Sequence, residues 1–266
     1  MNSFTTLEWV RDTRGVVTLW LNRPDKNNAF NAQMLAELTE ALATLKADTD
    51  CRLLVLRGRG RHFSAGADLR WMQASIHLGY DDNLADARVL SDLLHALYTL
   101  PVPTLAVVHG SAFGGALGLI SGCDMAIAAD DALFSLSEVR LGLAPAVISP
   151  YVVRAIGARA TKRYTLTGDR FGASQACQLG LLADVYPADS LDTAVAEWAA
   201  SLLKNGPVAQ RASKALLLEV AEADLSEPLR RRTEQLIAQL RCGAEGQEGI
   251  KAFLEKRAPA WQEGQP

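Results

Sequence analysis

The stretch TLAVVHGSAFGGALGLISGCDMAIA, residues 104–128, decides the fold of this chain. Thr104–Val108 is an apolar run, which predicts a buried strand. A glycine-rich turn follows, and the small and apolar residues from Ala116 to Cys123 then predict a short buried helix. Met125–Ala128 has the pattern of a second strand. Two buried strands joined through a helix are typical of layered α/β proteins, so we expect an α/β fold.

The same region is long and uncharged enough to be compared with a membrane span. No Asp, Glu, Lys or Arg occurs between Leu97 and Cys123, and its glycines have the GxxxG spacing of paired membrane helices. A membrane helix needs about 20 continuous apolar residues, whereas Pro101, Pro103 and the glycines divide this run, and His109 would lie in lipid. Globular strand and helix lengths explain the run better, and we expect no contact with a membrane.

On either side of this region the pattern alternates between strands and helices. Val16–Leu21 and Leu53–Leu56 predict strands, and Asn31 is a candidate cap for a helix with apolar residues at helical spacing. Asp86–Leu100 predicts a further helix. Beyond Ser149, which with the following proline is a candidate helix start, the strand patterns stop. The C-terminal segments that predict amphipathic helices are Ala194–Leu203, Val208–Val220, Leu229–Leu240 and Gly246–Lys256.

Composition and charge limit the classes of function. The chain has 266 residues, of which 49% are hydrophobic and 6% aromatic, and its net charge is −3. Nucleic-acid-binding proteins usually carry a basic face and stacking aromatics, so we expect no nucleic-acid partner. The cysteines are scattered singly, without the spacing of a zinc site or a disulfide framework, and the N-terminal segment lacks the apolar core of a secretory signal. We therefore expect a cytoplasmic protein without a bound metal.

Two glycine turns share one layout and are the first candidates for a functional site. HFSAGAD at residues 62–68 and HGSAFGGA at residues 109–116 each follow a buried strand and contain small residues with free backbone N–H groups. N–H groups at a helix start have no intrahelical partner and lie at the positive end of the dipole, so two of them could converge as an oxyanion hole. Tight turns without further function are the commoner use of glycine, and both interpretations stay open at this level.

Glu138 is the acidic residue that the pattern singles out. It lies in the mostly apolar stretch LFSLSEVRLGL, residues 133–143, shortly after the glycine-rich region. Most lone glutamates are solvated surface groups, but a buried Glu138 would have a raised pKa suited to proton transfer. Competing motifs fail, because Gly58 and Gly60 lack the third glycine of a dinucleotide fingerprint, and neither a P-loop nor a GxSxG elbow occurs.

Taken together, the motifs resemble one known family. The chain resembles the crotonase (enoyl-CoA hydratase/isomerase) superfamily, because its motifs occur in the same order along the sequence as in that family. These motifs are LNRP at 21–24, FSAGADL at 63–69, HG and GG in the second turn, SEVRLG at 137–142, LTG at 166–168 and FLEKR at 253–257. The resemblance implies an α/β crotonase-like spiral of ββα repeats over residues 1–200 and a C-terminal helical trimerisation region over residues 201–266. It further implies an acyl-CoA thioester substrate, a homotrimer or dimer of trimers, and no cofactor beyond the coenzyme A that is part of the substrate.

The resemblance also assigns roles to individual residues. It places the backbone N–H groups of Ala67 and Gly115 at the thioester oxygen as an oxyanion hole, and Glu138 at the carbon atoms that exchange protons. The residues that it implies along the coenzyme A path are Asn28, Ala29, Ser64, Ala65, Asp68, Leu69, Phe253 and Lys256. Stabilising an enolate with two fixed donors agrees with the chemistry suggested by the turns alone.

Two departures from the family pattern bear on the reaction. Hydratases of this family typically have a second glutamate in the helix after the glycines, where this chain has Gly118, and the usual Pro-Gly-x-Gly-Gly run is replaced by APAVISP at residues 144–150. The stretch from Ser137 to Pro150 resembles bacterial 3-methylglutaconyl-CoA and isohexenylglutaconyl-CoA hydratases. We therefore expect hydration of a branched 2-enoyl-CoA of the glutaconyl type, from leucine or acyclic terpene breakdown, with Glu138 as the single acid and base.

Two alternatives remain at this level. Gly118 is compatible with a Δ3,Δ2-enoyl-CoA isomerase, which needs only one carboxyl group to move a proton between two carbon atoms. The other alternative is a non-catalytic protein that binds acyl-CoA or RNA. The negative net charge and the presence of Glu138 count against this second alternative.

Overall fold

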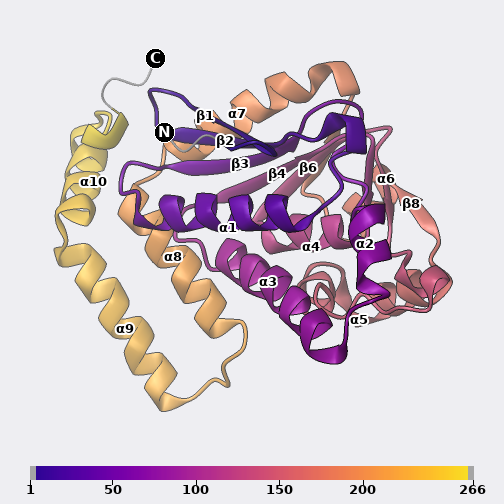
Figure 1. Ribbon diagram of the computed structural model, residues 1–266. Helices are drawn as coiled ribbons and strands as arrows, with labels where there is room; N and C mark the ends of the chain where they lie inside the picture. The colour runs from indigo at the N-terminus through magenta and orange to yellow at the C-terminus, as the bar shows by residue number, and fades with distance from the viewer. Residues whose placement is uncertain (1–3, 263–266) are drawn as a thin grey trace.

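A six-stranded sheet forms the centre of the chain (Figure 1). The computed structural model describes residues 4–262. The strands are β1 Leu7–Arg11, β2 Val16–Leu21, β3 Leu53–Gly58, β4 Thr104–Val108, β5 Ser111–Phe113, β6 Met125–Ala129, β7 Leu133–Ser135, β8 Arg170–Gly172 and β9 Asp184–Tyr186. The large sheet has the order β1-β2-β3-β4-β6-β9, in which β1 is antiparallel to β2 and the other pairs are parallel, while β5, β7 and β8 form a small second sheet.

Helices cover both faces of the large sheet, which confirms the predicted α/β arrangement. The α-helices are α1 Ala32–Ala47, α2 Leu69–Ser75, α3 Tyr80–Tyr98, α4 Gly115–Gly122, α5 Ser149–Thr167, α6 Ala173–Gln178, α7 Leu191–Leu203, α8 Pro207–Val220, α9 Glu227–Cys242 and α10 Ala244–Glu255. Short 3₁₀ turns are η1 Pro24–Lys26, η2 Glu138–Leu141, η3 Ala188–Ser190 and η4 Ala260–Gln262. In Figure 1, α1, α3 and α4 lie below the sheet and α7 lies above it.

The alternation of side chains along β3 divides the core into two layers. Leu54 and Leu56 belong to the buried cluster that contains residues of α1, α3 and α4, whereas Leu53 and Val55 pack with α7 on the opposite face. Because successive side chains of a strand point to opposite faces, a strand covered on both sides must be apolar throughout. The uninterrupted apolar run of β3 in the sequence follows from this double coverage.

The start of α1 follows from its capping residue. The Asn31 side chain accepts a hydrogen bond from the Met34 amide at 3.0 Å and so satisfies one N–H group that the first turn leaves unpaired. The apolar residues at helical spacing after it are all buried, namely Met34, Leu35, Leu38, Leu42 and Leu45. The capped, amphipathic helix predicted here is therefore confirmed.

The expectation that strands end near Ser149 is wrong. β8 and β9 lie further along the chain, and each is only three residues long, so neither shows the alternation by which a strand is recognised. Ser149 is also not the helix cap, because its hydroxyl donates to the carbonyl of Ala146 at 2.8 Å, and α5 begins after Ile148.

The helices α8, α9 and α10 form an arm beside the core (Figure 1). Among residues 207–262, Ala252 is the one buried residue, so the arm presents most of its surface outward. Lys214 of α8 fastens the arm to the core, since its ammonium group donates to the Asp124 carboxylate at 2.7 Å and to the Val102 carbonyl at 3.1 Å.

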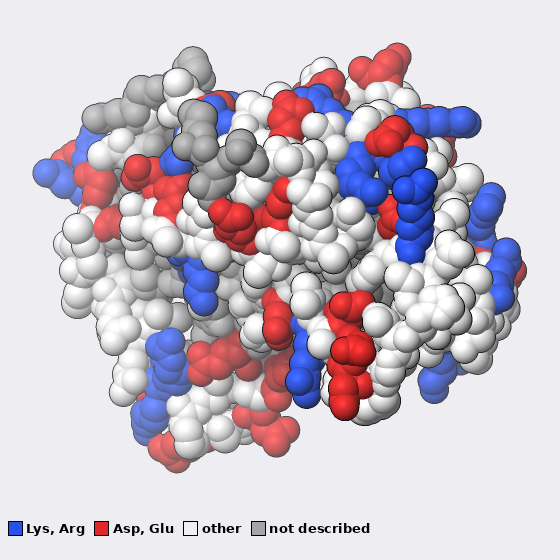
Figure 2. All heavy atoms as spheres, viewed as in Figure 1, with Lys and Arg blue, Asp and Glu red and all other residues white. Residues whose placement is uncertain are grey.

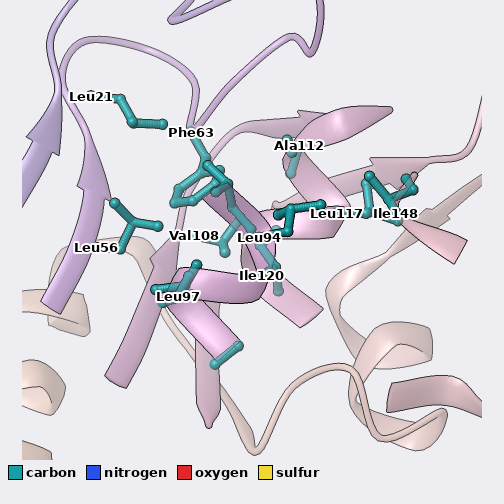
Figure 3. Packing of buried hydrophobic residues seen from close by; sticks show 14 of the residues in the cluster. Leu21, Leu56, Phe63, Leu94, Leu97, Val108, Ala112, Leu117, Ile120 and Ile148 are labelled. Atoms are coloured by element: carbon teal, nitrogen blue, oxygen red, sulfur yellow. The ribbon is translucent and has the colours of Figure 1, made fainter. Parts of the chain in front are cut away.

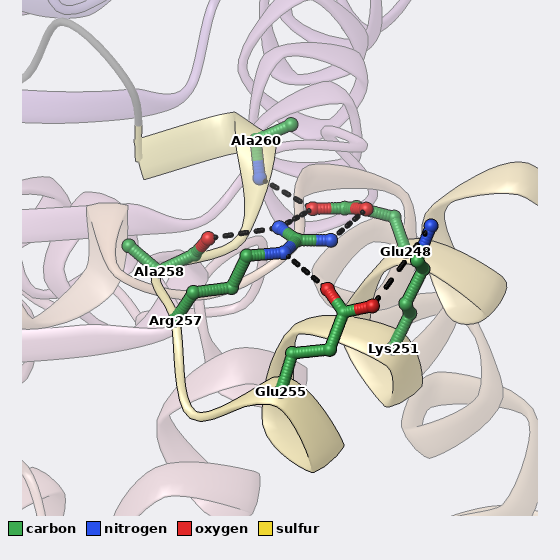
Figure 4. A network of polar contacts seen from close by, with 6 residues as sticks. All are labelled: Glu248, Lys251, Glu255, Arg257, Ala258 and Ala260. Carbon is green, nitrogen blue, oxygen red and sulfur yellow. Dashed lines mark hydrogen bonds and ion pairs between the residues drawn. The ribbon is translucent and has the colours of Figure 1, made fainter.

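Two polar contacts set the direction of α10 within the arm. The Glu245 carboxylate accepts the amides of Val208 and Ala209 at 2.9 and 2.8 Å and thereby caps the start of α8. Beyond the end of α10, the Arg257 guanidinium contacts the carboxylate of Glu248 at 2.6 Å (Figure 4). The hydrogen bonds from Arg257 and a backbone amide lower the pKa of Glu248 to about 2, so this ion pair persists in mildly acidic solution.

The mixed charges on the surface and the short elements within the uncharged run are both typical of a globular protein. Acidic and basic side chains are interspersed on the face shown in Figure 2. The run between Leu97 and Cys123 is divided into β4, β5 and the eight-residue helix α4, as its prolines and glycines predict. Within residues 4–262, no helix combines the length and the apolar character needed to cross a bilayer.

Candidate active site

The two glycine turns lie side by side and are joined by backbone hydrogen bonds. The Ser64 amide donates to the Ser111 carbonyl at 3.1 Å, and the Phe113 amide donates to the Ser64 carbonyl at 3.1 Å. Gly66 permits this close approach, because its φ is +88° and a Cβ atom there would lie 2.7 Å from the Phe113 carbonyl oxygen. Two segments that are far apart in the sequence therefore form one backbone surface.

This pairing leaves two amides free at the surface between the turns. Phe30 pairs with the groups that flank Ala67, since its amide donates to the Gly66 carbonyl at 2.7 Å and its carbonyl accepts the Asp68 amide at 2.8 Å. The N–H of Ala67 itself has no partner in the described part of the chain. Gly115 is the first residue of α4, so its N–H also has no intrahelical acceptor.

Ala67, Gly115 and Glu138 line one cavity of about 200 Å³. The other residues around this cavity are apolar or aromatic, namely Phe30, Leu35, Trp71, Leu90, Ala144, Pro145, Ala146, Val147 and Ile148. The structure thus brings together the three residues to which the sequence gives catalytic roles. An apolar wall around two free amides and one carboxylate strengthens their interaction with charge that develops at a defined point, because it limits the screening by water there.

Glu138 stands at the start of η2 with its carboxyl group turned into the protein. Its Oε2 atom is buried and has no hydrogen-bond partner among the described residues. Its Oε1 atom lies 3.1 Å from the place where a Cβ atom of Gly114 would stand. Burial raises the pKa of Glu138 above its ordinary value, although its own backbone amide works in the opposite direction. A partly desolvated carboxyl group with one oxygen free of partners is suited to accept and return a proton.

Glu138→Gln is expected to raise the thermal unfolding temperature at neutral pH. The pKa of Glu138 is higher in the folded state than its ordinary value of 4.5, so folding favours the protonated form. The stability that Glu138 contributes is therefore fully present below about pH 4.5 and is lost as the pH rises through the folded-state pKa. The uncharged Gln escapes this loss. Thermal unfolding of both proteins from pH 4 to pH 8 checks this, and a difference that is the same at every pH would contradict it.

The side chains of Asn28 and Ser64 form hydrogen bonds with backbone groups of the protein and are not directed toward a ligand. The buried Asn28 amide donates to the carbonyls of Arg59 and His62 at 2.8 Å, and its Oδ1 accepts the Arg23 amide at 2.9 Å. The Ser64 hydroxyl donates to the Asn28 carbonyl at 2.8 Å. Contact of these two residues with coenzyme A stays a prediction, and it would have to use backbone atoms.

Asn28→Ala is expected to lower the free energy of unfolding by about 2–4 kcal/mol, because it leaves buried carbonyl groups without donors. Asn27→Ala is a matched control. Asn27 also has a left-handed φ of 50°, against 53° for Asn28, but it is exposed, so its replacement costs mainly the backbone strain. Denaturant unfolding of both variants measures the difference, and equal losses would show that the Asn28 hydrogen bonds contribute nothing.

The remaining predicted residues of the core do not line the cavity, although they lie within two residues of Phe30 or Ala67, which do. Asp68 caps α2 by accepting the Arg70 amide at 2.8 Å and pairs with Arg23 at 2.9 Å. Burial would raise the pKa of Asp68, but the Arg70 amide and the Arg23 guanidinium together hold it below its ordinary value. Leu69, whose side chain is 78% exposed, follows on α2. The alanines of this set differ, since Ala29 is buried and Ala65 is exposed.

Phe253 and Lys256 are not brought to this site within one chain. Both lie at the end of α10, which packs against α8 and α9, and Figure 1 places α10 at the opposite side of the molecule from α2. Phe253 is 82% exposed. Their contact with coenzyme A stays a prediction, and it would require the arm of a second copy of the chain.

Sequence reasoning missed the apolar wall of the cavity. Trp71 and Leu90 approach from α2 and α3, and Val147 and Ile148 approach from the segment before α5. The unusual sequence APAVISP at residues 144–150 marked this segment as different from the family pattern. That it lines the cavity could not be predicted, because this depends on which residues lie opposite it in space.

The fold first defines a class, because structures with this architecture belong to crotonase-type enzymes. The sequence profile of the Enoyl-CoA hydratase/isomerase family matches residues 11–265. An enoyl-CoA hydratase from Shewanella pealeana has a structure with a TM-score of 0.93 and 43% identity, covering 97% of this chain and 96% of that one.

Two further relatives support the same assignment. The structure of Pseudomonas aeruginosa AtuE has a TM-score of 0.93 and 38% identity, covering 97% of this chain and all of that one (100%). The 2,3-dehydroadipyl-CoA hydratase of Escherichia coli K12 is 34% identical over 245 residues, which are 92% of this chain and 94% of the relative. The chain belongs to the enoyl-CoA hydratase/isomerase family. It has the crotonase fold and is an enzyme of the enoyl-CoA hydratase type.

Proposed function

We propose that this enzyme adds water to a short, branched 2-enoyl-CoA with Glu138 as its only acid and base. The observation that carries the proposal is the shared cavity of Glu138 with the free amides of Ala67 and Gly115. No other Asp or Glu of the described residues lines this cavity. One carboxyl group must therefore both take the proton from water and deliver a proton to carbon.

The geometry supports the following sequence of steps. The thioester oxygen accepts hydrogen bonds from the N–H groups of Ala67 and Gly115. The Glu138 carboxylate takes a proton from water while the water oxygen bonds to C3, and the electron pair of the double bond moves through C2 and C1 to the thioester oxygen. The two amides stabilise this enolate. Protonated Glu138 then gives its proton to C2, which restores the carboxylate and completes a syn addition.

Two findings support a glutaconyl-type acyl chain such as that of 3-methylglutaconyl-CoA. The stretch from Ser137 to Pro150 resembles the hydratases of such substrates, and the Escherichia coli relative is named for another acyl chain that ends in a carboxylate. A volume of about 200 Å³ is below the usual range of ligand pockets, which favours the short methyl-branched chain over a longer isohexenyl chain. Since no Lys, Arg or His of the described residues lines the cavity, the substrate carboxylate should remain hydrated at its mouth.

A Δ3,Δ2-enoyl-CoA isomerase is the second candidate, because such a reaction also needs one carboxyl group. The close packing at Gly118 leaves no room for a second acid, and this observation supports the isomerase as well as it supports a hydratase with one acid. Turnover of an acyl-CoA panel in deuterated water separates the two. Hydration should give a 3-hydroxyacyl product with one deuterium at C2, whereas a shifted double bond with no hydroxyl product from any panel member would establish the isomerase.

We also propose that the enzyme works as a homotrimer or a dimer of trimers. The outward surface of the arm supports this assembly, and so does the position of α10, which carries Phe253, on the side of the molecule opposite α2. The proposed chemistry uses only protein groups and the coenzyme A of the substrate. Sedimentation of the purified protein measures the assembly directly, and a monomer with full activity would contradict it.

A further inference from the structure

Gly118 and Ile148 form a contact that leaves no room for any side chain at position 118. A Cβ atom on Gly118 would lie 2.5 Å from Cγ2 of Ile148 and 3.2 Å from Cδ1 of Leu94. Gly118 lies inside α4, and its φ is not left-handed, so the backbone conformation alone does not require glycine. The Ile148 side chain, and not the backbone conformation, therefore requires glycine at this position.

This contact joins the two departures of the sequence from the family pattern. Gly118 stands where typical hydratases of the family have a second glutamate, and Ile148 belongs to the replaced run APAVISP. Ile148 comes from the segment before α5 but belongs to the same buried cluster as Leu117 of α4, and Figure 3 labels both residues. Ile148 is only 2% exposed and lines the cavity with Glu138. The hydrocarbon side chain of Ile148 thus fills the volume next to position 118 of α4, where typical hydratases of the family have a glutamate.

We propose that Ile148 determines specificity by packing against the substituent at C3 of the enoyl chain, an inference that rests on the proposed hydration. Gly118 follows Gly115 by three residues, which places it on the same face of α4 and about 4.5 Å further along the axis. The thioester oxygen is held at Gly115, and C3 lies two bonds beyond the carbonyl carbon. An acyl chain that runs along this face brings C3 and its branch next to Ile148.

The physical consequence is a preference for a methyl branch over hydrogen at C3. A methyl group that fills an apolar pocket contributes about 10–200-fold in kcat/KM over the same chain without it. The pair of 3-methylcrotonyl-CoA and crotonyl-CoA tests this, because these thioesters differ only in the methyl group at C3. Neither has a terminal carboxylate, so the comparison is independent of the charge expected for the natural substrate.

The kinetic test compares wild type with Ile148→Ala. The ratio of kcat/KM for 3-methylcrotonyl-CoA to that for crotonyl-CoA should fall by about tenfold or more in the variant. Leu90→Ala enlarges the same cavity from α3 and is the matched control, for which we expect a change of less than about threefold. An unchanged ratio in Ile148→Ala, or an equal fall in Leu90→Ala, would overturn the specificity role.

A second measurement tests the contact without relying on turnover. Gly118→Ala should lower the unfolding temperature, whereas Gly122→Ala in the same helix should not, because its Cβ atom would lie 3.5 Å from Leu97. In a double-mutant cycle, Gly118→Ala should cost much less stability when it is added to Ile148→Ala than when it is added to wild type, whereas its cost in a Leu97→Ala background should be the same as in wild type. Gly118→Ala as stable as wild type would overturn the packing argument.

The two measurements keep the inference distinct from the proposed function. Wild-type enzyme that hydrates both thioesters, with a ratio that Ile148→Ala leaves unchanged, would refute the role of Ile148 and leave the hydratase proposal intact. Wild-type enzyme that hydrates no member of an acyl-CoA panel would refute the hydratase proposal and with it the specificity role, even if the unfolding measurements confirm the contact.

Discussion

Glu138→Gln is expected to lower kcat/KM for hydration by about 100-fold or more, which corresponds to about 2.7 kcal/mol of transition-state stabilisation. Gln has nearly the shape of Glu but cannot take a proton from water or return one to C2. The cavity offers no second carboxyl group among the described residues, so no neighbour can assume either role. Steady-state kinetics on the best substrate of the panel measures the loss.

The control for this variant is Glu197→Gln, which makes the same chemical change on the exposed surface of α7 and should leave activity unchanged. Binding of coenzyme A to Glu138→Gln should also be unchanged, because the proton-transfer group acts on the acyl chain. Near-normal turnover by a folded Glu138→Gln enzyme would refute Glu138 as the acid and base.

Gly115→Pro is expected to lower kcat by about 10²–10³-fold, or about 3–4 kcal/mol, because proline has no N–H to donate to the thioester oxygen. Gly115 is the first residue of α4, where proline is compatible with the helix. The variant therefore removes one donor of the proposed oxyanion hole with limited damage to the fold. Circular dichroism should establish that it is folded before the kinetics are compared.

Gly115→Ala is the matched control for the loss of the donor. Alanine retains the N–H but adds a Cβ atom 3.2 Å from the Phe30 ring, so it reproduces the steric part of the change. We expect a much smaller loss than with proline. If alanine and proline reduce kcat equally, crowding against Phe30 explains the effect and the oxyanion role of Gly115 fails.

The sequence predicted those parts of the fold that depend on local patterns. The double coverage of β3 follows from its apolar run, and the start of α1 follows from Asn31, because both depend on periodicity or on hydrogen bonds within a few residues. Three-residue strands such as β8 and β9 were missed, since so short a segment has no measurable period and is held by its neighbours in the sheet.

The candidate site was predicted in part. The small residues of the two turns indicated free amides, and the apolar surroundings of Glu138 in the sequence allowed its burial. Family resemblance supplied the roles, which local patterns alone leave open. Phe253 and Lys256 show the limit, because a helix and its cap can be recognised from sequence, whereas the direction of the arm that carries them depends on contacts such as that of Lys214 with Asp124.

The sequence by itself determined the α/β class, the sharp turns at the glycines and the presence of one carboxyl group near them. Tertiary structure alone decided that Gly66 lies against the backbone of the second turn, that Oε2 of Glu138 has no hydrogen-bond partner among the described residues, and that Ile148 fills the place beside Gly118. The physical reason is that periodicity and capping act over a few residues, whereas burial and close approach are properties of two surfaces that meet. Residues 118 and 148 depart from the family pattern separately in the sequence, and only their contact shows that they are one feature.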